Sequence, residues 1–363
     1  MSDQKIAEKT RAAAIREKLA KILTPVTADQ DMRQILADVL REQGFGMRRQ
    51  VETTPWPAED PTRLALAKKG IVLDTETTGF DSKENGITQL SMIEFFYDDE
   101  GIFRIGGMFD RYNDPGEPIS EEITKITGIT DEMVAGRKIE DSELAEFIEG
   151  AERIIAHHAA FDREFVEEKF PDAGFDKIVW DCSIEQIDWA ARGFNSQKLE
   201  IIAANMGYVY DAHRADSDIL ATLRVLDKPG PDGMRSAFSE MIENSALDYV
   251  HIIATGSPFS GKDILKDAGY KWDGEGTKTR GKGKAWHIFT TATQENLDAQ
   301  AEVLRAAYGR EISLEVFVMD GKTRYSDRPA TRREVLRTAE PSTLIDTLRM
   351  STLADADANP TLV

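Results

Sequence analysis

The sequence predicts an α/β protein whose central domain is a mixed β-sheet flanked by helices. Strand-like runs come first, at 70–74, 87–97 and 102–111, and helical patterns then alternate with one further strand. That order is typical of a sheet with both parallel and antiparallel pairs. Two Pro- or Gly-rich stretches, 53–61 and 227–234, separate this domain from its flanks. A length of 363 residues, 41% of them hydrophobic, leaves room for two or three packed cores.

The elements of the central domain follow from their own patterns. The first strand contains a short apolar run, and the next two strands alternate apolar and polar residues with a period of two. We expect short helices within 117–136 and at 140–149, a buried strand at 153–158, and helices at 160–169, 183–191, 197–206 and 214–226.

The two flanks have different patterns. Residues 4–24 and 29–43 carry apolar residues at helical spacing and predict an N-terminal helical extension. From 248 onward, a strand, a helix, a hairpin, a second helix and a final strand predict a small α+β domain. The expected boundaries are a helical extension at 1–52, a linker at 53–69, the central domain at 70–228, a linker with a helix at 229–247, the small domain at 248–330 and a polar tail at 331–363.

Negative charge is concentrated in the central domain. Residues 71–228 contain 15 Lys and Arg against 35 Asp and Glu, a net charge of −20 that equals the net charge of the whole chain. A domain with this charge repels nucleic acid. A polyanionic substrate therefore needs metal ions or local basic patches in order to approach it.

The single cysteine and the terminus bear on the compartment. Cys182 is alone, which excludes an intrachain disulfide and a cysteine-based zinc cluster and favours a reducing compartment. The N-terminus lacks the apolar core of a signal sequence, and no apolar run reaches membrane-spanning length. We therefore expect a cytoplasmic protein with no membrane partner.

Asp74 and Glu76 are the most informative pair in the chain. They follow the apolar run 71–73 and lie two positions apart, so a strand places both carboxylates on one face. Two carboxylates at the end of a buried strand repel each other and are costly to desolvate. A divalent cation offsets that cost. The alternative is a solvated edge strand, which the preceding apolar run disfavours.

Three further residues complete an ordered set. Asp162 is expected at the start of a helix in the motif HHAAFD, and His213 and Asp218 lie in HRADSD at the start of another helix. Each acid alone is better explained as a helix cap or a solvated acid. The histidine alone is better explained as a surface loop residue. The ordered set of D-x-E on a strand, then HxAFD, then H-x4-D is much more specific.

On these motifs, residues 70–228 resemble the DEDDh exonucleases, the family that contains the proofreading subunit of bacterial replicative polymerases, RNase T and oligoribonuclease. DTETTG matches the first motif of that family, HHAAFD matches the second, and HRADSD matches the third in its histidine form. ITGITDEM is similar to the segment between the first two motifs. His158 departs from the pattern, since the family commonly has asparagine there, close to the nucleic-acid strand. An altered substrate preference is therefore expected.

The resemblance implies an RNase H-like fold and 3′–5′ hydrolysis of DNA by a two-metal mechanism that releases nucleoside 5′-monophosphates. It makes His213 the general base on the attacking water. The implied ligands of the two ions are Asp74, Glu76, Asp162 and Asp218. The chemistry of these residues agrees, because oxygen ligands favour Mg2+ or Mn2+ and two such ions clamp the attacking and leaving oxygens. An imidazole also titrates near neutral pH.

The same resemblance implies a binding site for the terminal nucleotide. Backbone groups of a turn hold that nucleotide, and a stacking aromatic and a neighbouring helix contact the last bases. The implied residues are Thr77, Thr78, Gly79, Phe80, Ile126, Thr127 and His158. For Phe80, a place in the core is the alternative.

A basic loop in the small domain is a candidate for a second nucleic-acid site. Its cations are Lys278, Arg280, Lys282 and Lys284, and the nearby aromatics are Tyr270, Trp272 and Trp286. Cations beside aromatics suit single-strand binding through phosphate contacts and stacking. The alternative is a solvated hairpin loop over a small aromatic core. A further six Lys and Arg within 322–337 predict a basic arm or a soluble tail.

We therefore expect an exonuclease that acts on the 3′ end of DNA, with RNA as the alternative substrate. A polymerase or another replication or repair protein is a candidate partner through the flanks. The alternative of another class is a nucleic-acid-binding or polymerase-docking adaptor that uses a nuclease fold. The complete set of four acids and one histidine argues against that alternative.

Overall fold

The computed structural model describes most of the chain. The described residues are 49–51, 61–64, 67–230, 233–276 and 278–348. The helices expected at 4–24 and 29–43 lie outside these ranges. No helix within them is both long and apolar enough to cross a membrane.

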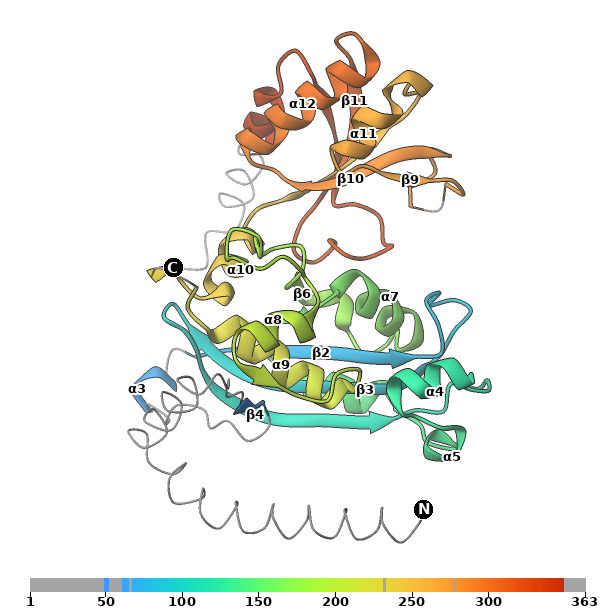
Figure 1. The fold of residues 1–363 in the computed structure, drawn as a ribbon, viewed down its shortest axis with the longest axis vertical. Coiled ribbons are helices and arrows are strands. Elements are labelled where there is room, and N and C mark those ends of the chain that lie inside the picture. The colour runs from blue at the N-terminus through green and yellow to red at the C-terminus, as the bar shows by residue number, and fades with distance from the viewer. Residues whose placement is uncertain (1–48, 52–60, 65–66, 231–232, 277, 349–363) are drawn as a thin grey trace, which may run out of the picture.

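The central sheet has the strand order β4-β3-β2-β5-β6 (Figure 1). Its strands are β2 (Lys68–Thr77), β3 (Ile87–Asp98), β4 (Gly101–Tyr112), β5 (Ala151–Ala156) and β6 (Val179–Cys182). β3 pairs antiparallel with both β2 and β4, whereas β5 runs parallel to both β2 and β6. The mixed sheet predicted from the sequence is confirmed.

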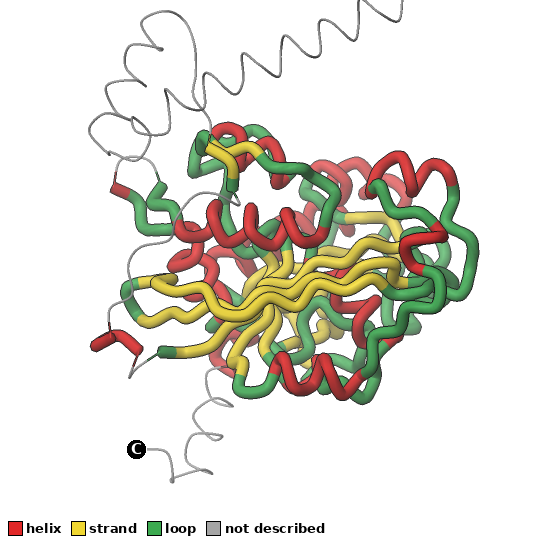
Figure 2. Tube along the Cα trace, turned by 90° about the horizontal axis from the view of Figure 1, so that it is seen from below, coloured by secondary structure: helices red, strands yellow, loops and turns green. Residues whose placement is uncertain are grey.

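Helices cover both faces of this sheet (Figure 2). They are α4 (Glu121–Thr127), α5 (Asp131–Val134), α6 (Asp141–Ile148), α7 (Ala159–Lys169), the 3-10 turn η1 (Phe175–Lys177), α8 (Leu199–Asn205), α9 (Ala215–Asp227) and α10 (Ala237–Ser245). The helix expected at 183–191 is wrong, because turns occupy that segment. There the Gln186 side chain accepts from the Cys182 N–H at 2.7 Å and donates to Asp181 at 2.9 Å, which fixes a non-helical path.

Strand β2 is buried on both faces, and its successive side chains point alternately to the two faces. Val72 packs with Ile219 of α9 on one side of the sheet. Ile71 and Leu73 pack with Phe165 of α7 on the other side. Because successive residues of a strand point to opposite faces, the end of β2 can reach helices on both sides.

A second sheet follows, with the order β12-β11-β8-β10-β9 and antiparallel pairing throughout. Its elements are β8 (Tyr249–Ala254), η3 (Phe259–Gly261), α11 (Lys262–Asp267), β9 (Lys271–Asp273), β10 (Ala285–Thr291), α12 (Gln294–Tyr308), β11 (Ser313–Met319) and β12 (Arg332–Arg337). The predicted small α+β unit is confirmed, with a core of its own between this sheet and its helices.

The polar tail expected from 331 onward is wrong for residues 332–348. β12 forms the edge of the second sheet, and residues 342–348 are helical. Leu336 and Leu344 are buried in the core of this unit. Ion pairs account for part of the positive charge here, since Arg332 lies 2.8 Å from Asp248. The apolar positions are sparse among charged ones, which is why the sequence suggested a tail.

Two short elements precede β2. β1 (Arg49–Gln50) pairs parallel with β7 (Tyr208–Val209), and Val51 is buried in the α9-side core. The end of the expected helical extension is therefore a strand instead of a helix. A short helix, α3 (Pro61–Leu64), lies within the expected linker.

The two sheets meet around α7. Arg163, which is fully buried, donates to the main-chain carbonyls of Lys322 and Arg324 at 2.6 Å each. Lys278 lies 2.8 Å from Glu164. The second unit is therefore fixed against the same helix that carries Asp162.

Candidate active site

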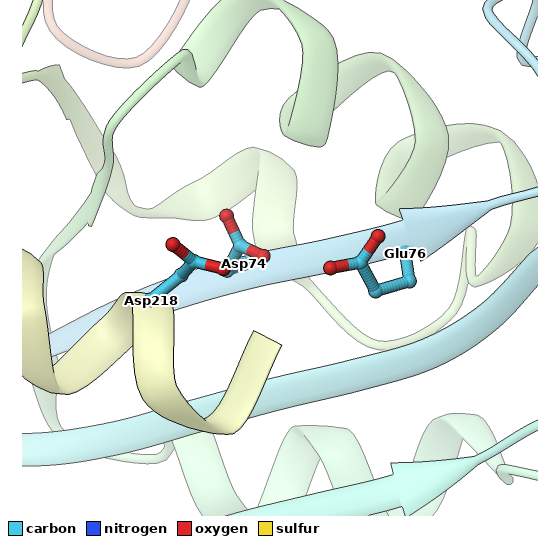
Figure 3. A group of neighbouring side chains, drawn as sticks. All are labelled: Asp74, Glu76 and Asp218. Atoms are coloured by element: carbon cyan, nitrogen blue, oxygen red, sulfur yellow. The ribbon is translucent and has the colours of Figure 1, made fainter. Parts of the chain in front are cut away.

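Asp74, Glu76 and Asp218 form one compact group. Asp74 and Glu76 continue the face of β2 that looks toward α9, and Asp218 stands in the first turn of that helix. One carboxylate oxygen from each lies within 4.8 Å of the others. Figure 3 shows the three side chains extending from β2 and α9 toward the space between them.

Asp162 approaches the group of Asp74, Glu76 and Asp218 from the opposite face of the sheet. It lies in the first turn of α7, directly after β5. Thr75, which points to the α7 side of β2, donates to Asp162 Oδ1 from its backbone N–H at 3.0 Å and from its hydroxyl at 2.8 Å. The fourth predicted ligand is thus anchored between Asp74 and Glu76, next to the compact group but not within it.

The four carboxylates are costly to keep ionised together. Burial raises the pKa of Asp74 well above its usual range, and repulsion from Asp162 and Asp218 adds to this. Burial, with repulsion from Asp218, raises the pKa of Glu76 to about 8. Burial also raises the pKa of Asp162 to about 7 and that of Asp218 to about 6, against hydrogen bonds that favour their charged forms. A positive charge between them would relieve this cost.

This donor set fits divalent cations. Every donor is a carboxylate oxygen, the ligand type that Mg2+ and Mn2+ prefer. Asp74, Glu76 and Asp218 have the spacing to share one ion, and Asp162 lies close enough to raise the pKa of Asp74. Placing several buried like charges together without such an ion would serve no structural purpose.

His213 stands at the entrance to α9, exposed, in the loop that precedes the helix. Its φ of 63° is in the left-handed region, which few non-glycine residues adopt. The next residue, Arg214, donates its backbone N–H to Asp218 Oδ2 at 3.0 Å. The charge of His213 lowers the pKa of Asp218, so the imidazole lies close to this carboxylate. A histidine at this position can exchange protons with a water at the edge of the group.

The sequence did not single out Tyr210, which also belongs to the site. Its hydroxyl is buried, has no hydrogen-bond partner among the described residues, and acts to lower the pKa of Asp218, which burial raises. Burial, followed by the charge of Asp218, raises the pKa of Tyr210 itself. In the sequence, Tyr210 is distinguished only by lying three residues before His213, and that spacing does not indicate a role.

The turn after β2 is tightly self-bonded. The Thr77 hydroxyl donates to the Gly79 carbonyl at 2.7 Å, and the Thr78 hydroxyl accepts from the Gly86 N–H at 2.9 Å. A Cβ on Gly79 would lie 2.5 Å from Asn85 Oδ1, so a larger residue would displace the Asn85 side chain. Because the threonine side chains serve the turn, a bound nucleotide would meet mainly its backbone.

An aromatic rim borders the carboxylates. Phe80 is 89% exposed, so the alternative that it belongs to the core is wrong. Its ring meets Phe161 edge-on with centroids 6.4 Å apart. His158, also exposed, lies parallel to the same Phe161 ring at 6.2 Å. We call Phe80, Phe161 and His158 the aromatic rim.

Ile126 and Thr127 lie at the end of α4 and differ in exposure. Ile126 is exposed, whereas Thr127 is buried. The Thr127 hydroxyl donates to the Ile123 carbonyl and accepts from the Ile129 N–H, both at 3.1 Å. The hydroxyl of Thr127 therefore shapes the helix end, and Ile126 is the member of this pair that offers a surface.

The predicted basic loop is largely occupied by intramolecular contacts. Lys278 pairs with Glu164, and Lys282 pairs with Glu315. The partners of Arg280 are the ring of His251 at 3.3 Å and the Arg328 carbonyl at 2.8 Å. Lys284 is exposed. A sequence count of cations does not reveal these partners, because they come from distant segments.

Comparisons with known proteins find relatives of the central domain. Residues 71–226 match the RNase T family, described as "Exonuclease". Over 162 residues the chain is 32% identical to a DNA polymerase III of PolC type from Clostridium perfringens and 31% identical to one from Streptococcus suis, covering 43% of this chain in each case. The chain spans 11% of the length of these relatives. A solved structure of exonuclease X in complex with 5′-overhanging duplex DNA is similar over 47% of this chain and 99% of its own, with 21% identity and a TM-score of 0.34.

Proposed function

Residues 71–226 are a domain of the exonuclease family, and from that premise we propose that the protein is a metal-dependent 3′–5′ exonuclease that acts on DNA and releases nucleoside 5′-monophosphates. The observation that carries this proposal is the convergence of Asp74, Glu76 and Asp218 within 4.8 Å, with Asp162 held beside them by Thr75. DNA is the proposed substrate because the similar PolC-type proteins are named as DNA polymerases.

The four carboxylates would hold two divalent ions, which would neutralise charge on the scissile phosphate and on the attacking and leaving oxygens. The protein residues supply position and proton transfer. The backbone of the turn 77–79 and the exposed ring of Phe80 bind the terminal nucleotide, so that its phosphodiester lies over the carboxylates. The turn is already held in shape by its own hydrogen bonds.

His213 accepts a proton from the attacking water on a ring nitrogen. Its position suits this role, because the side chain is exposed to solvent water and stands beside Asp218. Such general-base assistance is typically worth about 100- to 10,000-fold in rate.

The proposal is tested with oligonucleotides labelled at the 3′ or the 5′ end, as single-stranded DNA, duplex DNA and RNA, in Mg2+, Mn2+ or EDTA. We expect immediate release of the 3′ label as a mononucleotide and a ladder of shortening products from the 5′-labelled strand. EDTA should abolish both. Release of the 5′ label first, or hydrolysis in EDTA, would contradict the proposal.

The same assay separates the alternatives. Faster digestion of RNA than of DNA would make the protein an exoribonuclease. Binding of nucleic acid without hydrolysis in either metal would instead support an adaptor that uses a nuclease fold. A polymerase or another replication or repair protein remains a proposed partner, to be tested by co-purification.

A further inference from the structure

The hairpin formed by β9 and β10 lies beside the proposed active site. Lys278, in its loop, is 2.8 Å from Glu164, which follows Asp162 by two residues on α7. The charge of Asp81, the residue after Phe80, also acts on Lys278. In Figure 1 this hairpin lies above α7. The second unit therefore meets the central domain at α7, close in sequence to Asp162.

The hairpin loop has a defined shape. The carboxylate of Asp273 accepts hydrogen bonds from the backbone N–H groups of Glu275, Gly276, Lys278 and Thr279, at 2.7 to 3.2 Å. Such a nest around one buried carboxylate fixes the loop without a regular turn.

Positive charge at the hairpin contrasts with the acidic domain beside it. Residues 271–284 contain five Lys and Arg against two Asp and Glu. Of these cations, Lys278 and Lys282 pair with Glu164 and Glu315, whereas Lys271 and Lys284 are exposed. Lys271 is exposed, and its ammonium has no ion pair within the part of the chain that the structure describes. Its charge is felt by His158 of the aromatic rim, where it opposes protonation of that histidine. The Cα partner of Lys271 in β10 is His287, so Lys271 lies on the face of the sheet that carries His287 and His251.

An exposed aromatic pair stands on the other face of the same edge. Trp272 is 53% exposed and lies directly opposite Trp286 of β10, with ring centroids 5.6 Å apart. β9 is the last strand of its sheet, so one of its edges is unpaired. Since Lys271 and Trp272 point to opposite faces, a flexible strand passing around this edge meets both.

We propose that the free edge of β9, with Lys271 and Trp272, binds a single-stranded stretch of the nucleic acid whose 3′ end occupies the carboxylate site. Charge complementarity selects a polyanion, since this is a basic edge next to a strongly acidic domain. The exposed rings select unpaired bases, because base faces are available for stacking only when a strand is not in a duplex. This inference rests on the proposed exonuclease function and adds its substrate class.

The test compares Lys271→Ala and Trp272→Ala with two matched controls, one in α11 and one in η3. Lys266→Ala removes an exposed lysine of α11, and Phe259→Ala removes a ring that is 82% exposed in η3. Affinity for a fluorescent 20-nucleotide single strand is measured by anisotropy in EDTA, where no hydrolysis occurs, over a range of salt. KM and kcat are measured in Mg2+ on single-stranded and duplex DNA and on the p-nitrophenyl ester of thymidine 5′-monophosphate, which is too short to reach β9.

We expect Trp272→Ala to weaken single-strand binding at least about fivefold, in line with the stacking of one base. Lys271→Ala should reduce the slope of log affinity against log salt by about 0.7, the value for one phosphate contact on a single strand. For both variants KM on single strands should rise, while kcat on the short ester stays unchanged. Both control variants should behave as wild type.

Two results would overturn the inference. One is a wild type that binds no single strand in EDTA, and the other is a pair of β9 variants that bind no worse than the two controls. A third result is also informative: the wild type hydrolyses neither DNA nor the ester but binds single strands, and the β9 variants lose this binding. That result would support the β9 binding surface and reject the exonuclease function. The two claims therefore fail separately.

Discussion

Thr75 connects Asp162 to the strand that carries Asp74 and Glu76. Its backbone N–H and its hydroxyl both donate to the same oxygen of Asp162, at 3.0 and 2.8 Å. Thr75 lies between Asp74 and Glu76 but points to the opposite face of β2. One strand therefore supplies two acids directly and fixes a third through the residue between them.

Removing the Thr75 hydroxyl should weaken this connection. Thr75→Val keeps the shape of the side chain but leaves a buried carboxylate oxygen with one donor fewer, a loss of about 1–2 kcal/mol in the free energy of unfolding. Mg2+ affinity, measured by calorimetry, should fall as well. Thr75→Ser retains the hydroxyl and serves as the control. Wild-type affinity and stability in Thr75→Val would show that the contact does not hold Asp162.

Neutralising Asp74 should raise the thermal stability of the metal-free protein and remove the stabilisation that Mg2+ gives. Because burial and the neighbouring acids raise the pKa of Asp74, its ionised form destabilises the metal-free fold. At pH 8, Asp74→Asn should therefore raise the thermal midpoint in EDTA and abolish the increase that Mg2+ gives the wild type. Hydrolysis should be lost. Asp172→Asn, at an exposed position outside the site, is the control; a Mg2+-induced increase in Asp74→Asn would reject this residue as a ligand.

His213→Ala should slow hydrolysis without weakening metal binding. We expect a single-turnover rate about 100- to 10,000-fold lower, because water must then lose its proton without assistance. Calorimetry should give the wild-type affinity for Mg2+, since the imidazole lies outside the group of carboxylates. A normal single-turnover rate together with reduced metal affinity would assign the opposite role to this histidine.

Arg163 should matter far more for stability than Lys278, although both connect the second unit to α7. Arg163 is fully buried and is bonded to Glu167 at 2.7 Å and to two carbonyls, so Arg163→Met leaves these groups unpaired. The expected loss is about 3 kcal/mol. Lys278→Ala removes a half-exposed ion pair and should cost less than about 1 kcal/mol. Equal shifts of the urea midpoint would contradict this ranking.

His157 should make the fold less stable in acid. Burial lowers its pKa to about 4, against 6.5 for an ordinary histidine. Below pH 6.5 the unfolded chain binds a proton that the folded protein does not, so the free energy of unfolding falls as pH decreases from 6.5 to 4. The full shift corresponds to about 3 kcal/mol, and screening of the partly buried ring reduces this. His157→Gln, compared with wild type by urea unfolding at pH 7 and pH 4.5, should lose less stability in acid; parallel curves would contradict the assignment.

The positions of the four acids could be predicted from the sequence because each depends on the residues directly around it. Asp74 and Glu76 share a face as a consequence of strand geometry, and the apolar run before them places that strand in the core. The first turn of a helix carries each of the other two acids. Tyr210 is different, because its contact with Asp218 depends on how the loop before α9 folds, and no spacing rule encodes that path.

The misses came from contacts between distant segments. Charge counting identified Lys278 and Lys282 as a basic patch, but Glu164 and Glu315 neutralise them only after the chain folds. β12 was taken for a tail because its outward-facing positions are charged, and a single buried residue such as Leu336 is a weak signal of an edge strand. In both cases the missing information was a partner more than 12 residues away in the sequence.

The central claim is that Asp74, Glu76, Asp162 and Asp218 bind divalent ions that drive hydrolysis from a 3′ end. The most direct measurement is the Mg2+ dependence of mononucleotide release from a 3′-labelled single strand by wild type and by Asp74→Asn, side by side with metal affinity from calorimetry. We predict a rate that rises with Mg2+ occupancy in the wild type and no metal-dependent release in the variant. Mg2+-dependent release by Asp74→Asn at the wild-type rate would contradict the account.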